Sequence, residues 1–452
     1  MNTEKINQCM QAYVENQEIS GAALIVRKGD EIVFKNKWGY SRVENKTPVA
    51  YHSIFRMMSM TKCITGVCIL KLMEEGKLSL EDPISKFIPE FKDLKVSCDE
   101  RYYFTPEKLK KLPLYLLTFR AKNVKTEPLK RQITIKDLMS HSSGIEQGIV
   151  GVLEMIKMKE KHTCLRDRVL YYAGIPSGFQ PGTDTGYSPL AGFDILGYII
   201  ELVSGQSFND YMQEHICKPL DMKDTTFFLN EEQKKRLVDV YIRKKEKLVN
   251  VTETKKDMMG MLHQESGIRF EEGGGGLFST VEDYEHFADM LLHNGVYEGK
   301  QVLKEETIAL MQIEASEKHL EPDPGMVWGL SVKLRQEPQK SGSFATEGTY
   351  GWSGAFGTHY FVSPKDNLEA VFVTNRADLN GSGSYISQKV EELVREEINP
   401  RDSWRASKAF RIQIGGEIAK RALAESIRRG MVAGVTVDDQ EFVKKVTGGE
   451  QA

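Results

Sequence analysis

The chain has 452 residues and a mass of 51.3 kDa, and its 61 Lys and Arg nearly balance its 64 Asp and Glu. A net charge of −3 disfavours a nucleic-acid-binding protein, which normally carries a surplus of basic residues. Six cysteines without a Cys-x-x-Cys pair disfavour a disulfide framework, and no apolar stretch reaches the roughly 18 residues of a membrane helix. The N-terminus lacks the basic start and apolar run of a signal peptide. We therefore expect a reduced, cytoplasmic protein that binds neither nucleic acid nor a membrane.

The beginning of the chain predicts two helices that flank a β-hairpin. Apolar positions at helical spacing predict a helix over 3–16 and another over 59–75, which ends near Gly76. Between them, β-branched and apolar runs on both sides of the turn at 28–30 predict a hairpin over 22–34.

The middle of the chain is mostly helical in pattern, from about 135 to 220. Four consecutive glycines, 273–276, predict a loop, because such a free backbone does not suit the interior of a helix or strand. No Gly-Lys-Ser/Thr follows, which disfavours a phosphate-binding loop. Residues 101–131 hold nine Lys and Arg against two Asp and Glu. We interpret them as a basic insertion, either merely solvated or forming a lid or partner surface.

The last part of the chain adds strands to the pattern. It predicts a helix over 281–294, strands over Val327–Leu334, Thr358–Val362 and Leu368–Thr374, and a helix over 385–398. Strands at both chain ends with helices between them predict an α+β fold, in which an antiparallel sheet is flanked by helices. The sheet part would be about 1–75 and 275–398, with a helical domain inserted at about 76–274. Together they form a domain 1–398, and 399–452 a C-terminal helical extension whose role stays open: dimerisation arm, cap or frayed end.

The sharpest local motif is Ser59-Met60-Thr61-Lys62, at the start of the second predicted helix. Positions three apart lie on one helix face, so the Ser59 hydroxyl and the Lys62 amine can approach each other. A serine becomes a strong nucleophile when a base removes its proton, and a lysine can be that base when its surroundings lower its pKa. The motif is too short to establish this chemistry by itself.

Four further motifs follow it in order. They are Ile133–Gly144, which ends in Ser140-His141-Ser142-Ser143-Gly144, then Pro181–Pro189 around Tyr187, Gly273–Thr280, and Gly351–Thr358 with Trp352-Ser353-Gly354. Together the motifs resemble the serine β-lactamase and penicillin-binding-protein superfamily, and most closely its class C β-lactamase-related branch. That branch includes family VIII esterases, D-amino-acid-specific peptidases and some acyltransferases. The resemblance covers about residues 10–398 and implies a β-lactamase/transpeptidase-like fold.

The resemblance also implies roles for single residues. Ser59 would be the acylated nucleophile and Lys62 its proton acceptor. Tyr187 matches the tyrosine of the family's Tyr-x-Asn motif, where it would shuttle a proton between the nucleophile and the leaving group. The N–H of Ala355 would be the second oxyanion donor, beside that of Ser59.

Two positions depart from the family's pattern. Trp352, Ser353 and Gly354 fall where the family has Lys-Thr-Gly on the strand that lines the site, so Trp352 replaces a cation that would attract a β-lactam carboxylate. Pro189 replaces the Asn of Tyr-x-Asn, which would bind substrate amides and the lysine. Both losses disfavour an antibiotic-degrading enzyme and favour the esterase-like branch. Ser353 keeps a hydroxyl, which we expect to be able to contact a substrate.

Other chemistry-bearing residues have simpler interpretations. We interpret His141 as a packing residue, and Cys63 and Cys68 as buried thiols of the second helix. His286 and His293 share a helix face but have no carboxylate or cysteine partner in a ligand pattern, so we expect no metal site.

The sequence thus predicts a serine hydrolase that works through an acyl-Ser59 intermediate, without a metal or organic cofactor. The expected substrate is a small ester or amide, either a short acyl ester or a D-amino-acid-containing, peptide-like molecule. Two alternatives stay open: an acyltransferase that uses the same acyl-enzyme, and a non-catalytic binding protein, which the loss of Asn at Pro189 allows. A homo-oligomer is compatible with the sequence.

Overall fold

The computed structural model describes residues 3–100, 123–157, 164–252, 270–316, 324–341, 343, 345–381 and 383–398. All of them lie in one unit of the chain, residues 1–399. The predicted C-terminal extension 399–452 and most of the basic insertion 101–131 lie outside the described residues, so those predictions stay predictions.

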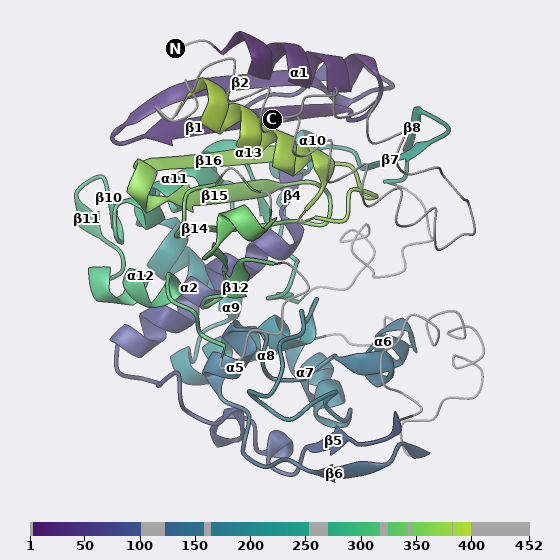
Figure 1. The fold of residues 1–452 in the computed structure, drawn as a ribbon, viewed down its shortest axis with the longest axis vertical. Helices are drawn as coiled ribbons and strands as arrows, with labels where there is room; N and C mark the ends of the chain where they lie inside the picture. The colour runs from purple at the N-terminus through teal and green to yellow at the C-terminus, as the bar shows by residue number, and fades with distance from the viewer. Residues whose placement is uncertain are drawn as a thin grey trace, which may run out of the picture. The chain divides into compact units, whose positions relative to one another are not determined.

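An antiparallel sheet built from both ends of the chain organises this unit. Within the described residues it has eight strands, in the order β12-β13-β14-β15-β16-β1-β2-β3. Their bounds are β1 Gly21–Lys28, β2 Glu31–Arg42, β3 Thr47–Pro48, β12 Met326–Trp328, β13 Lys333–Arg335, β14 Thr349–Ser353, β15 His359–Ser363 and β16 Leu368–Thr374. In Figure 1 the purple N-terminal β1 lies against the green C-terminal β16, and the two pair with Ala22 opposite Thr374. The predicted α+β fold with a sheet from both termini is confirmed.

Both faces of the central strands are buried. In β1 the alternate residues Ala22, Leu24 and Val26 belong to one apolar cluster, whereas Ala23 and Ile25 belong to another. This is the two-residue period of a strand, and it explains why β1 reads as a continuous apolar run.

Helices cover both faces. α1 (Glu4–Glu15) and α13 (Tyr385–Glu397) pack on the first face, and α2 (Thr61–Glu74) and α11 (Val281–Leu292) on the second. α8 (Ala191–Ser204) joins the inserted helical part to α2. Among the described residues, the other α-helices are α5 Ile135–Met139, α6 Gly148–Lys157, α7 Leu165–Ala173, α9 Phe208–Met212, α10 Glu231–Arg236 and α12 Glu305–Met311. A π-helical turn lies at Gln213–Cys217, and 3₁₀ turns lie at Met58–Met60 (η1), Ile84–Lys86, Pro89–Phe91, Pro338–Ser341 and Pro364–Asp366. Short ladders are formed by β4 Phe55–Arg56 with β9 Phe278–Ser279, β5 Lys95–Ser97 with β6 Thr126–Pro128, β7 Tyr241–Lys244 with β8 Lys247–Asn250, and β10 Val296–Tyr297 with β11 Lys300–Gln301. None of the described helices combines the length and apolar character needed to cross a membrane.

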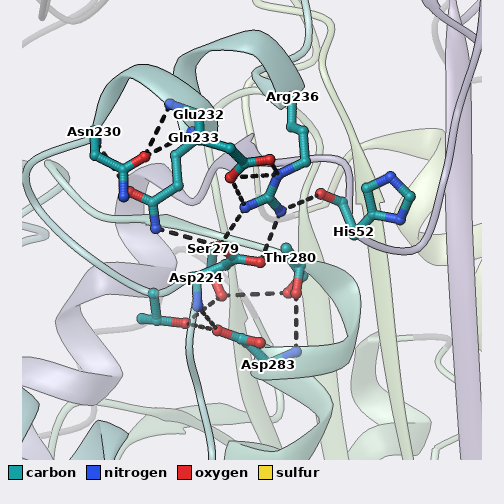
Figure 2. A network of polar contacts seen from close by, with 10 residues as sticks. His52, Asp224, Asn230, Glu232, Gln233, Arg236, Ser279, Thr280 and Asp283 are labelled. Carbon is teal, nitrogen blue, oxygen red and sulfur yellow. Dashed lines mark hydrogen bonds and ion pairs between the residues drawn. The ribbon is translucent and has the colours of Figure 1, made fainter.

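A polar network fixes the segment that leads into β4. Arg236, at the end of α10, donates to the two oxygens of Asp224 at 2.7 and 2.6 Å and to the carbonyl oxygen of His52 at 2.9 Å (Figure 2). The backbone N–H of Asp224 donates to Asp283 of α11 at 2.7 Å. Hydrogen bonds from Arg236 lower the pKa of Asp224, which keeps the pair charged. The network therefore ties α10 and α11 to the strand that precedes η1.

Most predicted elements are confirmed. The helices expected over 3–16, 59–75, 281–294 and 385–398 correspond to α1, η1 with α2, α11 and α13. The hairpin expected over 22–34 is β1–β2, and the four glycines form a loop. The hairpin β7–β8 was not predicted, because its charged sequence shows no clear alternation.

The single strand predicted over Val327–Leu334 is wrong, since the segment is the hairpin β12–β13. The N–H of Gly329 donates to the carbonyl of Val332 at 3.0 Å, which closes the turn. Ser331 has a left-handed φ of 64°, and its N–H donates to the carbonyl of Met139 at 2.8 Å. The turn itself is buried, so the apolar pattern continues through it and hides it.

Candidate active site

Ser59 lies in η1, at the junction between β4 and α2. The residue before it, Met58, has a left-handed φ of 51°, a conformation that a non-glycine residue adopts only when its surroundings impose it. The Met58 side chain is held in an apolar cluster with Val240, Val251 and Phe356. The bend therefore fixes the direction in which the half-buried Ser59 is presented.

Lys62 lies one turn further, in the first turn of α2, and is 1% exposed. Its Nζ lies 3.2 Å from Ser59 Oγ, 2.6 Å from the carbonyl oxygen of Pro189 and 2.5 Å from that of Gly274. An ammonium has three protons for these three oxygens. A neutral amine has two protons for the two carbonyls and one lone pair, which then faces Ser59. The site therefore accommodates both protonation states without movement of the side chain.

Tyr187 meets the same oxygen from the other side. Its hydroxyl donates to Ser59 Oγ at 2.6 Å. Its ring stacks on Trp328, with centroids 5.9 Å apart and planes 14° apart, and the Lys62 ammonium lies 5.1 Å from the Tyr187 ring centroid. The structure thus brings together the three residues that the resemblance assigns to catalysis.

The glycines of the loop 273–276 allow its backbone to lie close to the backbone of α8 and the residue before it. A Cβ on Gly273 would lie 2.2 Å from the carbonyl oxygen of Phe193, and one on Gly274 would lie 2.8 Å from the Cα of Leu190. Only glycine fits here, and the fit brings the Gly274 carbonyl to the Lys62 amine.

Behind that loop lies a buried cluster of charged groups. The N–H of Gly274 donates to Asp194 at 3.2 Å, and Asp194 lies 3.7 Å from Arg168. Burial raises the pKa of Asp194, and the guanidinium of Arg168 opposes that rise. Arg168 also forms a 2.9 Å ion pair with Glu272.

Trp352 and Ser353, which are neighbours at the end of β14, face opposite sides of the sheet. Trp352 faces the site, where its ring lies 5.3 Å from that of Tyr187. Ser353, the next residue, faces the opposite side, because neighbouring residues of a strand alternate. Its Oγ lies 2.7 Å from His359 Nδ1, and His359 Nε2 lies 2.8 Å from Glu391 of α13. The structure therefore does not bring the Ser353 hydroxyl to Ser59.

The turn after β14 packs against the backbone beside Ser59. A Cβ on Gly354 would lie 2.3 Å from the carbonyl oxygen of Met57, and the Thr358 hydroxyl donates to that same oxygen at 3.2 Å. Within the described residues, the N–H groups of Ser59 and Ala355 donate to no acceptor. Both donors are therefore available for a developing oxyanion.

Comparisons with known proteins identify the family. A family model described as Beta-lactamase matches residues 6–395. The chain belongs to the beta-lactamase family. A putative D-alanyl-D-alanine carboxypeptidase from Escherichia coli K12 is 24% identical over 402 residues, which are 83% of this chain and 83% of that protein.

Solved structures show the same fold. EstCE1, a hydrolase with promiscuous acyltransferase activity, matches with a TM-score of 0.70 and 20% identity over 87% of this chain and 98% of its own. The octameric penicillin-binding protein homologue from Pyrococcus abyssi matches with a TM-score of 0.64 and 22% identity over 88% of this chain and 78% of its own.

The departure at Pro189 has a structural counterpart in this beta-lactamase-family chain. A proline has no side-chain amide, but its carbonyl oxygen accepts the 2.6 Å hydrogen bond from Lys62 Nζ. The backbone thus makes the contact with the lysine that the family's Asn side chain would make. The proline side chain itself offers no amide to a substrate.

The departure at Trp352 also has a counterpart, which sequence reasoning missed. Lys333 of β13 lies opposite Gly351, the neighbour of Trp352, and its Nζ is 5.5 Å from the Trp328 ring and 5.8 Å from the Trp352 ring. A cation therefore stands beside the indole, although on the adjacent strand. Among the described residues, the buried Trp352 Nε1 has no hydrogen-bond acceptor.

The remaining candidates lie away from Ser59, and His293 has carboxylate partners that its sequence pattern did not indicate. Cys63 and Cys68 are buried, and burial raises the pKa of both thiols. His286 Nδ1 lies 2.9 Å from the carbonyl of Leu220, and His293 pairs with Asp289 at 2.7 Å. Within the described ranges, no group of three His, Cys, Asp or Glu side chains could hold a metal ion.

Proposed function

We propose that this beta-lactamase-family protein is a serine hydrolase that acts on small esters or amides through an acyl-Ser59 intermediate. One observation carries the proposal: Ser59 Oγ lies within hydrogen-bond distance of both the Lys62 amine and the Tyr187 hydroxyl. A base and an acid on either side of one nucleophile are what acyl transfer needs.

The proposed acylation passes one proton from Ser59 through Lys62 and Tyr187. Lys62, as a neutral amine, takes the proton of the Ser59 hydroxyl, and the oxygen attacks the substrate carbonyl. The N–H groups of Ser59 and Ala355 stabilise the oxyanion. When the intermediate collapses, Tyr187 gives its proton to the leaving group and recovers one from Lys62. Water then releases the acyl group by the reverse route, which leaves Ser59 protonated.

The proposed substrate is a short acyl ester or a D-amino-acid-containing, peptide-like amide. The indole rings of Trp352 and Trp328, whose centroids are 4.7 Å apart, supply apolar area for an acyl chain. The peptide alternative is supported by the Escherichia coli relative, which is named as a putative D-alanyl-D-alanine carboxypeptidase.

Acyl transfer to an amine or alcohol is a second candidate, favoured by the name of EstCE1, a hydrolase with promiscuous acyltransferase activity. The two activities share the acyl-enzyme and differ in what captures it. The name of the Pyrococcus abyssi homologue, which is octameric, supports self-association as a further proposal.

Covalent labelling tests the proposal. A fluorophosphonate probe should label the wild-type chain at Ser59, as read by mass spectrometry of peptides, and Ser59→Ala should lose the label and turnover. Ser204→Ala is a matched control, because this half-buried hydroxyl donates to the carbonyl of Ile200 and accepts from the N–H of Gln206, both near the end of α8. A folded Ser59→Ala variant that keeps near-native esterase activity would sink the proposal. Folded wild type that neither labels nor turns over any ester or amide would favour the non-catalytic alternative.

A further inference from the structure

Residues 141–147, which we call the clamp, hold the loop that carries Tyr187. The N–H of Gly186 donates to the carbonyl of His141 at 2.8 Å, and the N–H of Ser188 donates to His141 Nδ1 at 3.1 Å. Gln147 Nε2 donates to the carbonyl of Tyr187 at 2.8 Å. The loop is neither helix nor strand, so these contacts replace the hydrogen-bond ladder that it lacks.

Glu146 holds the end of the same loop. Its Oε2 accepts hydrogen bonds from the Ser188 hydroxyl at 2.7 Å and from the N–H groups of Leu190 and Ala191 at 3.0 Å each. The last two donors begin helix α8, where N–H groups have no partner within the helix and an anion is favoured. Glu146 itself has a left-handed φ of 65°, so its backbone is bent to direct the carboxylate to these donors.

The two contacts of the proposed active site lie between these anchor points. Tyr187, whose hydroxyl meets Ser59, lies between Gly186 and Ser188. Pro189, whose carbonyl meets Lys62, lies between Ser188 and Leu190. Any shift of the loop would therefore move the phenol away from the nucleophile and the carbonyl away from the amine at the same time.

His141 contributes a second acceptor and has to stay neutral to do so. Burial lowers the pKa of its ring well below the ordinary histidine value, and the nearby Lys62 and Lys333 charges act in the same direction. Nδ1 therefore keeps the lone pair that accepts the Ser188 N–H. This goes beyond the packing role that the sequence suggests for His141.

We propose that Glu146 is a positioning residue of the active site. One of its carboxylate oxygens binds Ser188 and the start of α8, and these contacts keep Tyr187 next to Ser59 and Pro189 next to Lys62. The inference rests on the proposed function. It does not require Glu146 to touch the substrate.

A purely structural role would be to cap α8, and kinetics can separate the two roles. If Glu146 acts through Tyr187, its loss should lower kcat and kcat/KM equally, because the misplaced phenol is used only in the transition state. A displacement of about 1 Å can reduce a rate by roughly 10²-fold. Once the phenol is already absent, only the effect through Pro189 and Lys62 remains, so the same loss should be much smaller, since residues that act as a unit are not additive.

The experiment is a double-mutant cycle of Glu146→Ala and Tyr187→Phe, measured with a p-nitrophenyl ester well below each variant's melting temperature. We expect Glu146→Ala to lower kcat about 10²-fold in the wild type and far less in the Tyr187→Phe background. Glu146→Gln, which keeps an oxygen acceptor but no charge, should fall between wild type and Glu146→Ala. Glu369→Gln is the matched control: it makes the same change at a fully buried glutamate of β16, and it should leave kcat unchanged.

Equal fold-losses in the two backgrounds would overturn the proposal, as would a Glu146→Ala effect confined to the melting temperature or to KM. If Glu146→Ala does not fold, Ser188→Ala removes one donor from the same oxygen and should show a smaller loss with the same dependence on Tyr187. Failure of the proposed function looks different, because Ser59→Ala would then keep its activity whatever the cycle shows.

Discussion

The Tyr187 hydroxyl donates a hydrogen bond to Ser59 Oγ at 2.6 Å, from a loop 128 positions away in the chain. Lys62 Nζ, 3.2 Å from the same oxygen, donates to Ser59 Oγ as an ammonium and can accept the Ser59 proton as a neutral amine. In the proposed mechanism the two proton movements are therefore separated: Lys62 receives the proton of the nucleophile, and Tyr187 retains its own for the leaving group.

Replacement of Lys62 tests this separation. Lys62→Arg keeps the positive charge but removes the basic lone pair, because a guanidinium is not deprotonated in proteins. We expect it to lower kcat/KM about 10²–10⁴-fold, nearly as much as Lys62→Ala. Lys71→Arg is the control on the same helix, since Lys71 only donates to the carbonyl of Val302 and lies 4.0 Å from Glu74. An active Lys62→Arg enzyme would place the base elsewhere.

The turn after β14 gives a second prediction. Gly354→Ala would put a Cβ 2.2 Å from Thr358 Oγ1 and 2.3 Å from the Met57 carbonyl oxygen, so the turn must shift. Such a shift moves the Ala355 N–H, and loss of one oxyanion donor lowers kcat about 10²–10³-fold. Gly174→Ala is the control, because its Cβ meets only the carbonyl of Tyr171 at 3.4 Å.

The measurement for this glycine pair is kcat together with the melting temperature. The expected signature of Gly354→Ala is a large fall in kcat in a protein that still folds. A variant with native kcat would mean that the turn does not carry the oxyanion donor.

Local geometry decides which parts of the site were predictable from the sequence. Ser59 and Lys62 lie three apart on a helical turn, so their contact follows from helix geometry alone. Glu146 meets residues 42 to 45 positions away through a left-handed bend, which no periodic pattern encodes. Lys333 reaches the site only because a predicted single strand is in fact a hairpin that places β13 next to β14.

The alternation of strands could have been used further. Trp352 and Ser353 are neighbours on one strand, so they cannot both face the substrate. Once Trp352 is placed beside Tyr187, Ser353 has to face α13, where it meets His359. The fold, in contrast, could be predicted well, because its sheet strands and long helices carry clear periodic patterns and the motifs come in the family's order.

Glu369 predicts a pH dependence of stability. Burial and the neighbouring Glu285 carboxylate raise the pKa of Glu369 well above that of an ordinary glutamate. Between the ordinary value of about 4.3 and the raised one, the folded chain binds more protons than the unfolded chain. The free energy of unfolding should therefore fall as pH rises through this range, by at most about 1.4 kcal/mol per pH unit from this group.

Glu369→Gln should remove this contribution, because the amide does not titrate. The measurement is the urea midpoint of wild type and variant from about pH 5 to about pH 8. We expect the variant to gain stability relative to the wild type as pH rises. A stability difference that is constant over the whole range would contradict the assignment.

The last prediction concerns the substrate and rests on the corner formed by Trp328, Trp352 and Lys333. The two indoles offer apolar area, and each methylene buried against them contributes about 0.8 kcal/mol. A p-nitrophenyl butyrate should thus exceed the acetate in kcat/KM by up to about 1.6 kcal/mol, or roughly 15-fold. Trp352→Ala should reduce that ratio.

Nitrocefin tests the carboxylate side of the same corner. The cation here is Lys333 on the neighbouring strand, 5.8 Å from the Trp352 ring, and the amide contact of the family's Asn is lost at Pro189. We therefore expect weak turnover of nitrocefin by the wild type, with kcat/KM below that of the short esters. Lys333→Met should lower it further and leave the neutral esters unchanged, whereas Lys365→Met, at an exposed lysine after β15, should change neither. If the wild type prefers nitrocefin, the proposed preference for esters is wrong, and the enzyme resembles the family members that bind a substrate carboxylate.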